Sequence, residues 1–256
     1  MLRGIACFVY NQPATTITPA LIIYLIDASK SMNEACGSTT KIDVVNKALR
    51  DAMKDMVRRS MRDGVVQPRY KIAIFAYSTR VIDVLDGIRT LPELVHVGPP
   101  ILSAGGNTDT EAGFVEVARL LEAHLQEFDG CPAPLVCHLT DALLTTNVPQ
   151  HIVEYIQKMR VHDGSVLVEN VYVADNMLRK RVRDWHKWGG VLKPEQLTND
   201  YAKLLFSLSS PLPESYRENI NNHGYQLQSG AALFFPGARS DLVRLAFAIS
   251  SATQLK

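Results

Sequence analysis

The sequence predicts an α/β fold in which helices cover both faces of a doubly wound, mainly parallel, Rossmann-like sheet with one antiparallel edge strand. Two observations support this prediction. Short apolar runs alternate along the chain with longer segments whose apolar residues recur every three or four positions. The first run, Leu21–Ile26, consists of aliphatic and aromatic residues throughout, which is typical of a central parallel strand buried on both faces.

The first half of the chain contains three apolar runs and two segments of helical periodicity. In the first helical segment, Ile42, Val45 and Leu49 recur at helical spacing with polar residues between them. The third run follows the second after a short turn, so we expect those two strands to pair antiparallel. A loop rich in Gly and Pro comes next. The expected elements are a strand at 21–26, a helix at 41–62, strands at 71–76 and 80–85, and a helix at 110–128.

The second half continues the alternation and then interrupts it. The expected elements are a strand at 135–139, a helix at 148–161, strands at 165–173 and 231–235, and a closing helix from Ser240 to the C-terminus. Between positions 176 and 230 the alternation fails. Because this region has roughly 50 residues, near the lower limit for independent folding, we interpret 176–230 as a helical and loop elaboration of one domain that covers residues 1–256.

The composition argues against several classes of protein. With 27 basic and 26 acidic side chains the formal net charge is +1, whereas a dedicated nucleic-acid binder is normally strongly basic. The longest uninterrupted apolar run, Leu21–Ile26, is far shorter than the ~20 residues that span a bilayer. The four cysteines form no C-x-x-C pair, which indicates free thiols in a reducing compartment. We therefore expect a cytoplasmic location and neither membrane nor nucleic acid as a partner.

Three segments rich in oxygen donors are expected at the carboxyl ends of strands, where an open α/β sheet forms its ligand site. The first follows the strand at 21–26, the second precedes the helix at 110–128, and the third ends the strand at 135–139. Hard oxygen donors without His or Cys suit Mg²⁺, Mn²⁺ or Ca²⁺ and disfavour zinc or copper. The candidate metal-binding residues are Asp27, Ser29, Ser31, Thr108 and Asp141.

This set resembles the metal-ion-dependent adhesion site of the von Willebrand factor type A (vWA) domain family, whose pattern is Asp-x-Ser-x-Ser followed by a threonine and an aspartate. The resemblance covers residues 20–175 and implies the vWA fold. It also implies that Ser29, Ser31 and Thr108 contact the ion directly, whereas Asp27 and Asp141 act through water. Neutral hydroxyls leave most of the ionic charge uncancelled, so an Asp or Glu of a protein partner can fill an open coordination position.

Two positions depart from the usual pattern of that family. Lys30 stands where glycine is frequent and adds a cation next to the metal loop, which we expect to tune ion affinity. Ala142 follows Asp141 where glycine is also frequent, which restricts the turn to negative φ. Neither departure removes a ligand. The expected cofactor is a divalent cation, with Mg²⁺ as the first choice and Mn²⁺ or Ca²⁺ as alternatives.

The resemblance implies a protein–protein interaction module without catalytic residues. The chain is similar to stand-alone prokaryotic vWA proteins, including the tellurium-resistance-associated type, whose members accompany kinases, phosphatases or AAA+ ATPases in bacterial signalling, stress or defence systems. We expect a cytoplasmic module of this kind that captures an acidic residue of such a partner through its metal ion.

Two other functions stay open. A metal-dependent phosphoryl hydrolase would use Asp27 as its nucleophile, although Ser29 cannot replace the second acid that such an enzyme requires. A structural subunit would have an idle metal site because of Lys30 and would dock through a basic amphipathic helix expected near residues 178–187. His138 lies within a buried strand and is interpreted as a hydrogen-bonded core residue. Asp109 is expected to cap the helix that follows it.

Overall fold

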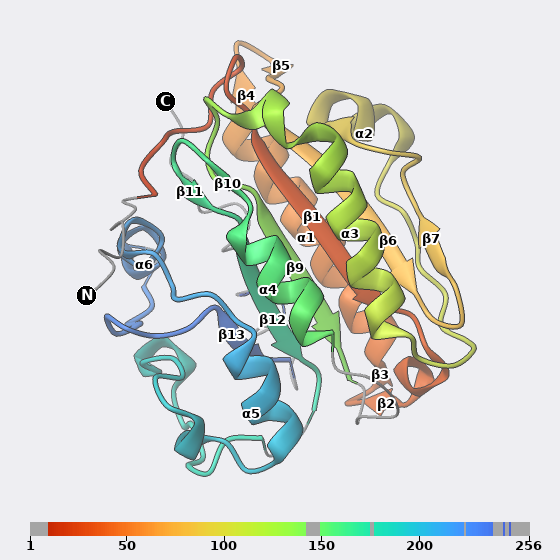
Figure 1. The fold of residues 1–256 in the computed structure, drawn as a ribbon, viewed down its shortest axis with the longest axis vertical. Coiled ribbons are helices and arrows are strands. Elements are labelled where there is room, and N and C mark those ends of the chain that lie inside the picture. Colours follow the sequence, from red (N-terminus) through yellow and green to blue (C-terminus); the bar gives the residue numbers. More distant parts are fainter. Residues whose placement is uncertain are drawn as a thin grey trace.

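The computed structural model describes residues 10–141, 149–174, 177–222 and 224–237, together with Val243 and Ala246. Its centre is a seven-stranded sheet (Figure 1). The strands of this sheet are β1 (Ala20–Asp27), β6 (Tyr70–Tyr77), β7 (Val81–Asp83), β8 (Arg89–Thr90), β9 (Leu135–Thr140), β12 (Leu167–Tyr172) and β13 (Phe234–Pro236).

The strand order is β13-β12-β9-β1-β6-β7, and β8 also pairs with β6. The pairs β12–β13, β9–β12, β1–β9 and β1–β6 are parallel, whereas β7 and β8 run antiparallel to β6. With these main strands numbered along the chain and β7 as the third, the order is that of a doubly wound fold, 3-2-1-4-5-6. The predicted α/β class and its antiparallel edge strand are confirmed.

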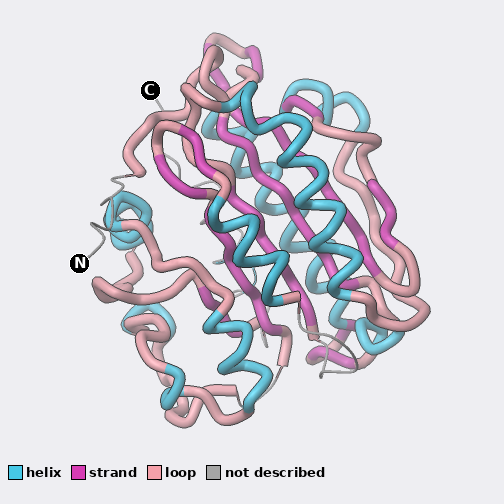
Figure 2. Tube along the Cα trace, in the orientation of Figure 1, coloured by secondary structure: helices cyan, strands magenta, loops and turns pink. Residues whose placement is uncertain are grey.

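Helices lie on both faces of the sheet (Figures 1 and 2). They are α1 (Lys41–Ser60), α2 (Leu91–Val97), α3 (Thr110–His124), α4 (Gln150–Lys158), α5 (Asp200–Ser207) and α6 (Glu214–Asn222). On β1, the even-numbered residues from Ile22 to Ile26 pack in the same cluster as the buried side of α1. The odd-numbered residues from Leu21 to Leu25 pack with α3 and α4. This two-sided burial is what the apolar run of β1 predicts.

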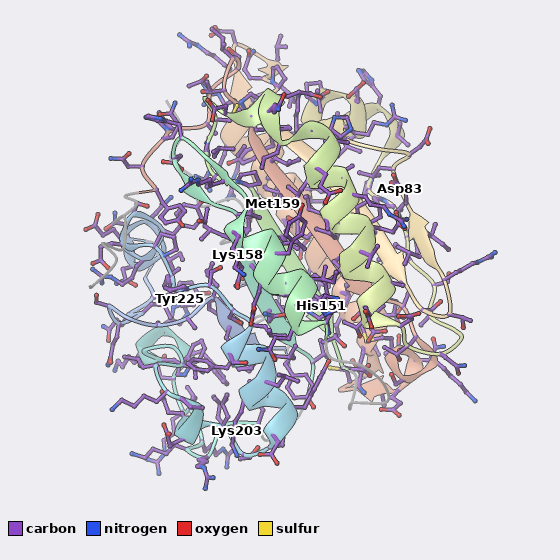
Figure 3. All side chains as sticks on the ribbon, viewed as in Figure 1. Asp83, His151, Lys158, Met159, Lys203 and Tyr225 are labelled. Atoms are coloured by element: carbon purple, nitrogen blue, oxygen red, sulfur yellow. The ribbon has the colours of Figure 1, made fainter. Side chains whose placement is uncertain are left out.

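Three short hairpins and four 3-10 turns complete the described elements. The hairpins are β2–β3 (Ala35–Cys36, Thr39–Thr40), β4–β5 (Met61–Arg62, Val65–Val66) and β10–β11 (Arg160–Val161, Gly164–Ser165). The turns are η1 (Lys30–Asn33), η2 (Leu125–Phe128), η3 (Trp185–Lys187) and η4 (Pro194–Gln196). The edge strand β7 is short and carries the exposed Asp83 (Figure 3), two features that discourage pairing with another molecule.

Several expected elements are longer than the observed ones, because hairpins begin where periodicity continues. The helix expected at 41–62 ends at Ser60, since Asp63 and Gly64 adopt positive φ and form the two-residue turn of β4–β5. The Gly- and Pro-rich segment after β7 is not entirely loop, because it contains α2. A capping box forms there, in which the Thr90 N–H and hydroxyl both donate to Glu93 Oε2 at 2.7 Å.

The prediction of a basic helix near residues 178–187 is wrong. Leu178 forms an isolated antiparallel bridge with Leu197, and the Arg179 N–H donates to the Gln196 carbonyl at 2.8 Å. These contacts use backbone groups that a helix would need for its own hydrogen bonds. Only the short turn η3 is helical in this stretch. The apolar residues Val182 and Trp185 still pack against the core, and the neighbouring basic side chains are exposed.

The described part of 176–230 consists of short helices and loops, and its apolar residues Trp188, Val191 and Leu197 join the cluster on the α1 side of the sheet. The helix expected from Ser240 lies outside the described residues, apart from Val243 and Ala246, which are helical and buried. No helix in the described ranges combines the length and the hydropathy needed to cross a bilayer. Two buried cysteines of the described ranges, Cys131 and Cys137, are free thiols.

Candidate metal centre

The three predicted segments meet at the carboxyl ends of β1 and β9. The loop after β1 is joined to the loop before α3 by two backbone hydrogen bonds. The Lys30 N–H donates to the Gly106 carbonyl at 3.0 Å, and the Gly105 N–H donates to the Ala28 carbonyl at 2.7 Å. Asp141 follows β9, which pairs directly with β1. The parallel sheet therefore places oxygen donors from distant parts of the sequence at one edge.

Four of the five predicted residues form a continuous hydrogen-bonded string. The Ser29 N–H donates to Asp27 Oδ1 at 2.8 Å. The hydroxyl oxygens of Ser29 and Ser31 are 3.1 Å apart, and the Ser31 hydroxyl donates to Asp141 Oδ1 at 2.7 Å. The structure thus brings Asp27, Ser29, Ser31 and Asp141 together as the sequence pattern suggests.

Asp27 is fully buried and both of its carboxylate oxygens accept hydrogen bonds. Besides the bond from Ser29, the Thr140 hydroxyl donates to Asp27 Oδ2 at 2.7 Å. Burial raises the pKa of Asp27, the nearby charge of Asp141 adds to this effect, and the hydrogen bonds from Ser29 and Thr140 oppose it. Asp27 is therefore a fixed acceptor that orients its neighbours.

Each serine hydroxyl lies near a carboxylate to which it can donate a hydrogen bond while its oxygen faces a cation. Ser31 has one hydroxyl proton and donates it to Asp141, so Ser29 is the donor in the contact between the two serines. The Ser29 hydroxyl also lies within hydrogen-bonding reach of the Asp27 carboxylate. Each serine therefore has a carboxylate that can take its proton, which leaves an oxygen lone pair of each serine for a cation.

The spacing of these hydroxyls fits a small octahedral ion. Neighbouring ligands around Mg²⁺, with metal–oxygen distances near 2.1 Å, are about 3.0 Å apart. The observed separation between Ser29 Oγ and Ser31 Oγ is 3.1 Å. Since the donors are hydroxyls and carboxylates, the residues present fit a hard divalent cation in both geometry and chemistry.

Thr108 lies in the adjoining loop, and its side chain is half-buried. The loop is fixed at both ends. Gly106 has a φ of +79°, and a Cβ there would lie 2.6 Å from the Thr79 hydroxyl. Asp109 caps α3 by accepting from the Ala112 N–H at 3.0 Å, which confirms its predicted role. The Thr108 hydroxyl makes no hydrogen bond to another residue that the structure describes, so the string of four does not include it.

Sequence reasoning missed Lys41 and Glu34. The Lys41 ammonium lies 2.6 Å from Asp141 Oδ2 and 2.6 Å from Glu34 Oε2. Burial alone would lower the pKa of Lys41, but the hydrogen bonds to Asp141 and Glu34 outweigh it and raise this pKa. In the sequence, Lys41 is only the first residue of an amphipathic helix. No periodicity links it to Asp141, which is 100 positions away.

His138 lies beneath the site in the core, as predicted. Its Nε2 is 2.8 Å from the Tyr77 hydroxyl, its Nδ1 is 2.8 Å from Asn170 Oδ1, and the Phe114 ring packs edge-on against it. Burial lowers the pKa of His138 to about 4, although the hydrogen bond to Asn170 raises it. Both ring nitrogens are thus occupied in a neutral imidazole. Among the described residues, no group of three or more His, Cys, Asp or Glu side chains is arranged to hold a metal ion.

The chain matches no model of a protein family and no curated protein sequence. It is similar in structure to the pilus adhesin SpaC from Lactobacillus rhamnosus GG, with 11% identity over 95% of this chain and 31% of that chain and a TM-score of 0.56. The PilB minor pilin from Streptococcus sanguinis has 9% identity over 90% of this chain and 60% of that chain, with a TM-score of 0.50.

A third similar structure is a von Willebrand factor type A protein from Catenulispora acidiphila, with 17% identity over 73% of this chain and 37% of that chain and a TM-score of 0.43. The chain spans less than two thirds of the length of each of these three proteins. The likeness to SpaC and PilB, with TM-scores of 0.56 and 0.50, shows a shared α/β fold, and identities this low show nothing beyond the fold.

Proposed function

We propose that the chain is a vWA-type interaction module in which Ser29, Ser31 and Thr108 hold one divalent cation and present it to an Asp or Glu of a protein partner. Mg²⁺ is the proposed ion, with Mn²⁺ or Ca²⁺ as alternatives. One observation carries the proposal. The hydrogen-bonded string from Asp27 to Asp141 contains two hydroxyl oxygens at the spacing of neighbouring ligands around an octahedral ion.

Each residue of the string has a defined task in this proposal. Ser29 and Ser31 offer neutral oxygens, and Thr108 completes the ligand set from the adjoining loop. Asp27 and Asp141 accept hydrogen bonds from the serine hydroxyls and so fix the direction of the lone pairs. When bound, the ion supplies a concentrated positive charge with an exchangeable position for a carboxylate. The carboxylate of the partner then binds where the protein itself contributes few anionic ligands.

The geometry favours binding over catalysis. A nucleophilic Asp27 would need an exposed carboxylate oxygen, yet this residue is fully buried and both of its oxygens accept hydrogen bonds. The phosphoryl hydrolase alternative therefore loses its proposed nucleophile. The structural-subunit alternative required docking through a basic helix, but residues 178–184 form a bridge and loops instead of a helix.

We propose a cytoplasmic setting in a bacterial signalling, stress or defence system of the tellurium-resistance-associated type. The acidic residue would come from a kinase, a phosphatase or an AAA+ ATPase. Support for this setting comes from the sequence resemblance and from the free thiols of Cys131 and Cys137.

Isothermal titration calorimetry with MgCl₂ and MnCl₂ tests the proposed site. We expect one-site binding by the wild type and at least about tenfold weaker binding by Ser31→Ala and by Thr108→Ala, because each loses one ligand of a weakly charged set. Ser103→Ala is the matched control, since Ser103 is an exposed serine in the loop that contains Thr108. Equal ion binding by all four proteins would exclude this site.

A further inference from the structure

The protein itself places a positive charge at the candidate metal centre, the ammonium group of Lys41. The Lys41 ammonium is within 2.6 Å of Asp141 Oδ2. The Lys41 side chain is 16% exposed and the Asp141 side chain is fully buried, so solvent screens this pair less than it screens a surface ion pair. Because Ser31 donates to the other oxygen of Asp141, both oxygens of that carboxylate are occupied.

The position of Lys41 in α1 is unfavourable for the helix itself. Lys41 is the first residue of α1, where the helix dipole is positive and an acidic side chain would be preferred. Asp43 and Thr40 already form a capping box at this end, so the helix does not need Lys41 as a cap. The carboxylates of Asp141 and Glu34 compensate for the charge.

We infer that Lys41 is a built-in competitor of the divalent cation for Asp141 and thereby sets the ion affinity of the site. This inference rests on the proposed function. An ion held by Ser29 and Ser31 depends on Asp141 to accept the hydrogen bond of Ser31 and to supply a negative charge nearby, while the Lys41 ammonium neutralises the charge of the same carboxylate. The ammonium also repels a divalent ion bound beside it, and this repulsion is strong where little water intervenes.

Glu34 determines how strongly Lys41 competes. Its Oε2 lies 2.6 Å from the Lys41 ammonium, and its side chain is 66% exposed, so it is a second anionic partner on the solvent side. When a divalent ion binds beside Asp141 and repels the ammonium, the ammonium keeps Glu34 as its partner. Without Glu34, Asp141 would be the remaining carboxylate in contact with Lys41, and the competition would increase.

The experiment compares ion affinities of four variants by calorimetry with MnCl₂ at constant ionic strength. We expect Lys41→Gln to bind Mn²⁺ at least about tenfold more tightly than the wild type. Lys41→Arg, which keeps the charge, should bind with nearly wild-type affinity. Glu34→Gln should bind more weakly. Lys47→Gln is the matched control, because it removes one exposed positive charge from the same helix, α1, and should change affinity less than about twofold.

Thermal unfolding in EDTA, measured for each variant, separates changes in ion affinity from changes in folding. Lys41→Met serves as a second charge-removing variant. Tighter Mn²⁺ binding by both Lys41→Gln and Lys41→Met than by the wild type supports the inference. Measurable binding by these two variants supports it equally if the wild type binds too weakly to measure. Affinity in Lys41→Gln that equals that of Lys47→Gln, or falls below that of the wild type, overturns the inference and leaves the proposed function intact. Binding by none of the proteins overturns the proposed function itself.

Discussion

Two adjacent residues of β12 carry buried polar side chains on opposite faces of the sheet, and their surroundings differ. Asn170 faces the α3 side. Its side-chain carbonyl oxygen accepts a hydrogen bond from His138, and its side-chain amide donates to the Ser209 hydroxyl at 3.0 Å. Glu169 faces the α1 side opposite Cys137. Neither carboxyl oxygen of Glu169 has a hydrogen bond of ordinary geometry among the described residues, and the Cys137 thiol is the polar group beside it.

The comparison teaches that burial alone does not determine what a polar residue contributes. On the α3 side, the Tyr77 hydroxyl donates to neutral His138, and His138 donates to Asn170, so each member satisfies the next. On the α1 side, burial raises the pKa of Glu169 well above its ordinary value and so favours the protonated form of this carboxyl in the folded state. The first arrangement stabilises the fold, whereas the second costs free energy at neutral pH.

The largest change in stability should follow from breaking the hydrogen-bonded arrangement of Tyr77, His138 and Asn170. His138→Leu removes the donor to the buried Asn170 carbonyl and the acceptor of the Tyr77 hydroxyl, which keeps contacts with Thr140 and Thr110. An unsatisfied buried group costs about 1–3 kcal/mol, and imperfect filling of the core by the new side chain adds to this loss. We expect a loss of about 4 kcal/mol in the free energy of unfolding, measured by urea denaturation at pH 7.

The double variant Tyr77→Phe/His138→Leu is the control for this prediction. It removes one of the two orphaned groups, so its loss should be smaller than the sum of the two single losses. Strictly additive losses would contradict the view that Tyr77 and His138 act as a unit.

The contributions of His138 and Glu169 to the free energy of unfolding should change with pH in opposite directions. An unfolded His binds protons below about pH 6.5, but buried His138 has a pKa of about 4. The unfolded state therefore holds the extra proton between these values, and the His138 contribution to stability is lost as pH falls through this window, by up to about 3 kcal/mol. Glu169 behaves in the reverse manner. Its contribution is complete below its ordinary pKa and is lost as pH rises towards its raised pKa.

Unfolding free energies of the wild type, His138→Leu and Glu169→Gln between pH 4 and pH 8 separate the two contributions. His138→Leu should lose the rising slope, and Glu169→Gln should lose the falling one. Parallel pH profiles for all three proteins would show that neither group carries the linkage.

The outcome of sequence reasoning follows from how far each signal extends along the chain. The strand β1 and the helix α1 are predicted correctly because the apolar run of β1 and the helical spacing of apolar residues in α1 are signals between near neighbours in the sequence. The meeting of Ser31 with Asp141 follows from a parallel sheet, whose carboxyl ends share one edge. The ion pair between Lys41 and Asp141 has no local signature, because only the tertiary fold places them together. The basic helix fails for a related reason, since the bridge to Leu197 overrides local periodicity.

The smallest effect should come from relieving the unsatisfied side. Glu169→Met replaces the buried carboxyl by an apolar group of similar length, so the fold no longer has to take up a proton at that position. We expect a gain of about 1–2 kcal/mol in unfolding free energy at pH 8, and a smaller gain at pH 5, where the unfolded carboxyl is itself partly protonated. Val168→Ala on the opposite face is the control, because it removes apolar volume and should destabilise at both pH values. A loss of stability in Glu169→Met at pH 8 would show that the carboxyl makes a stabilising contact, and the contrast between Glu169 and Asn170 would then disappear.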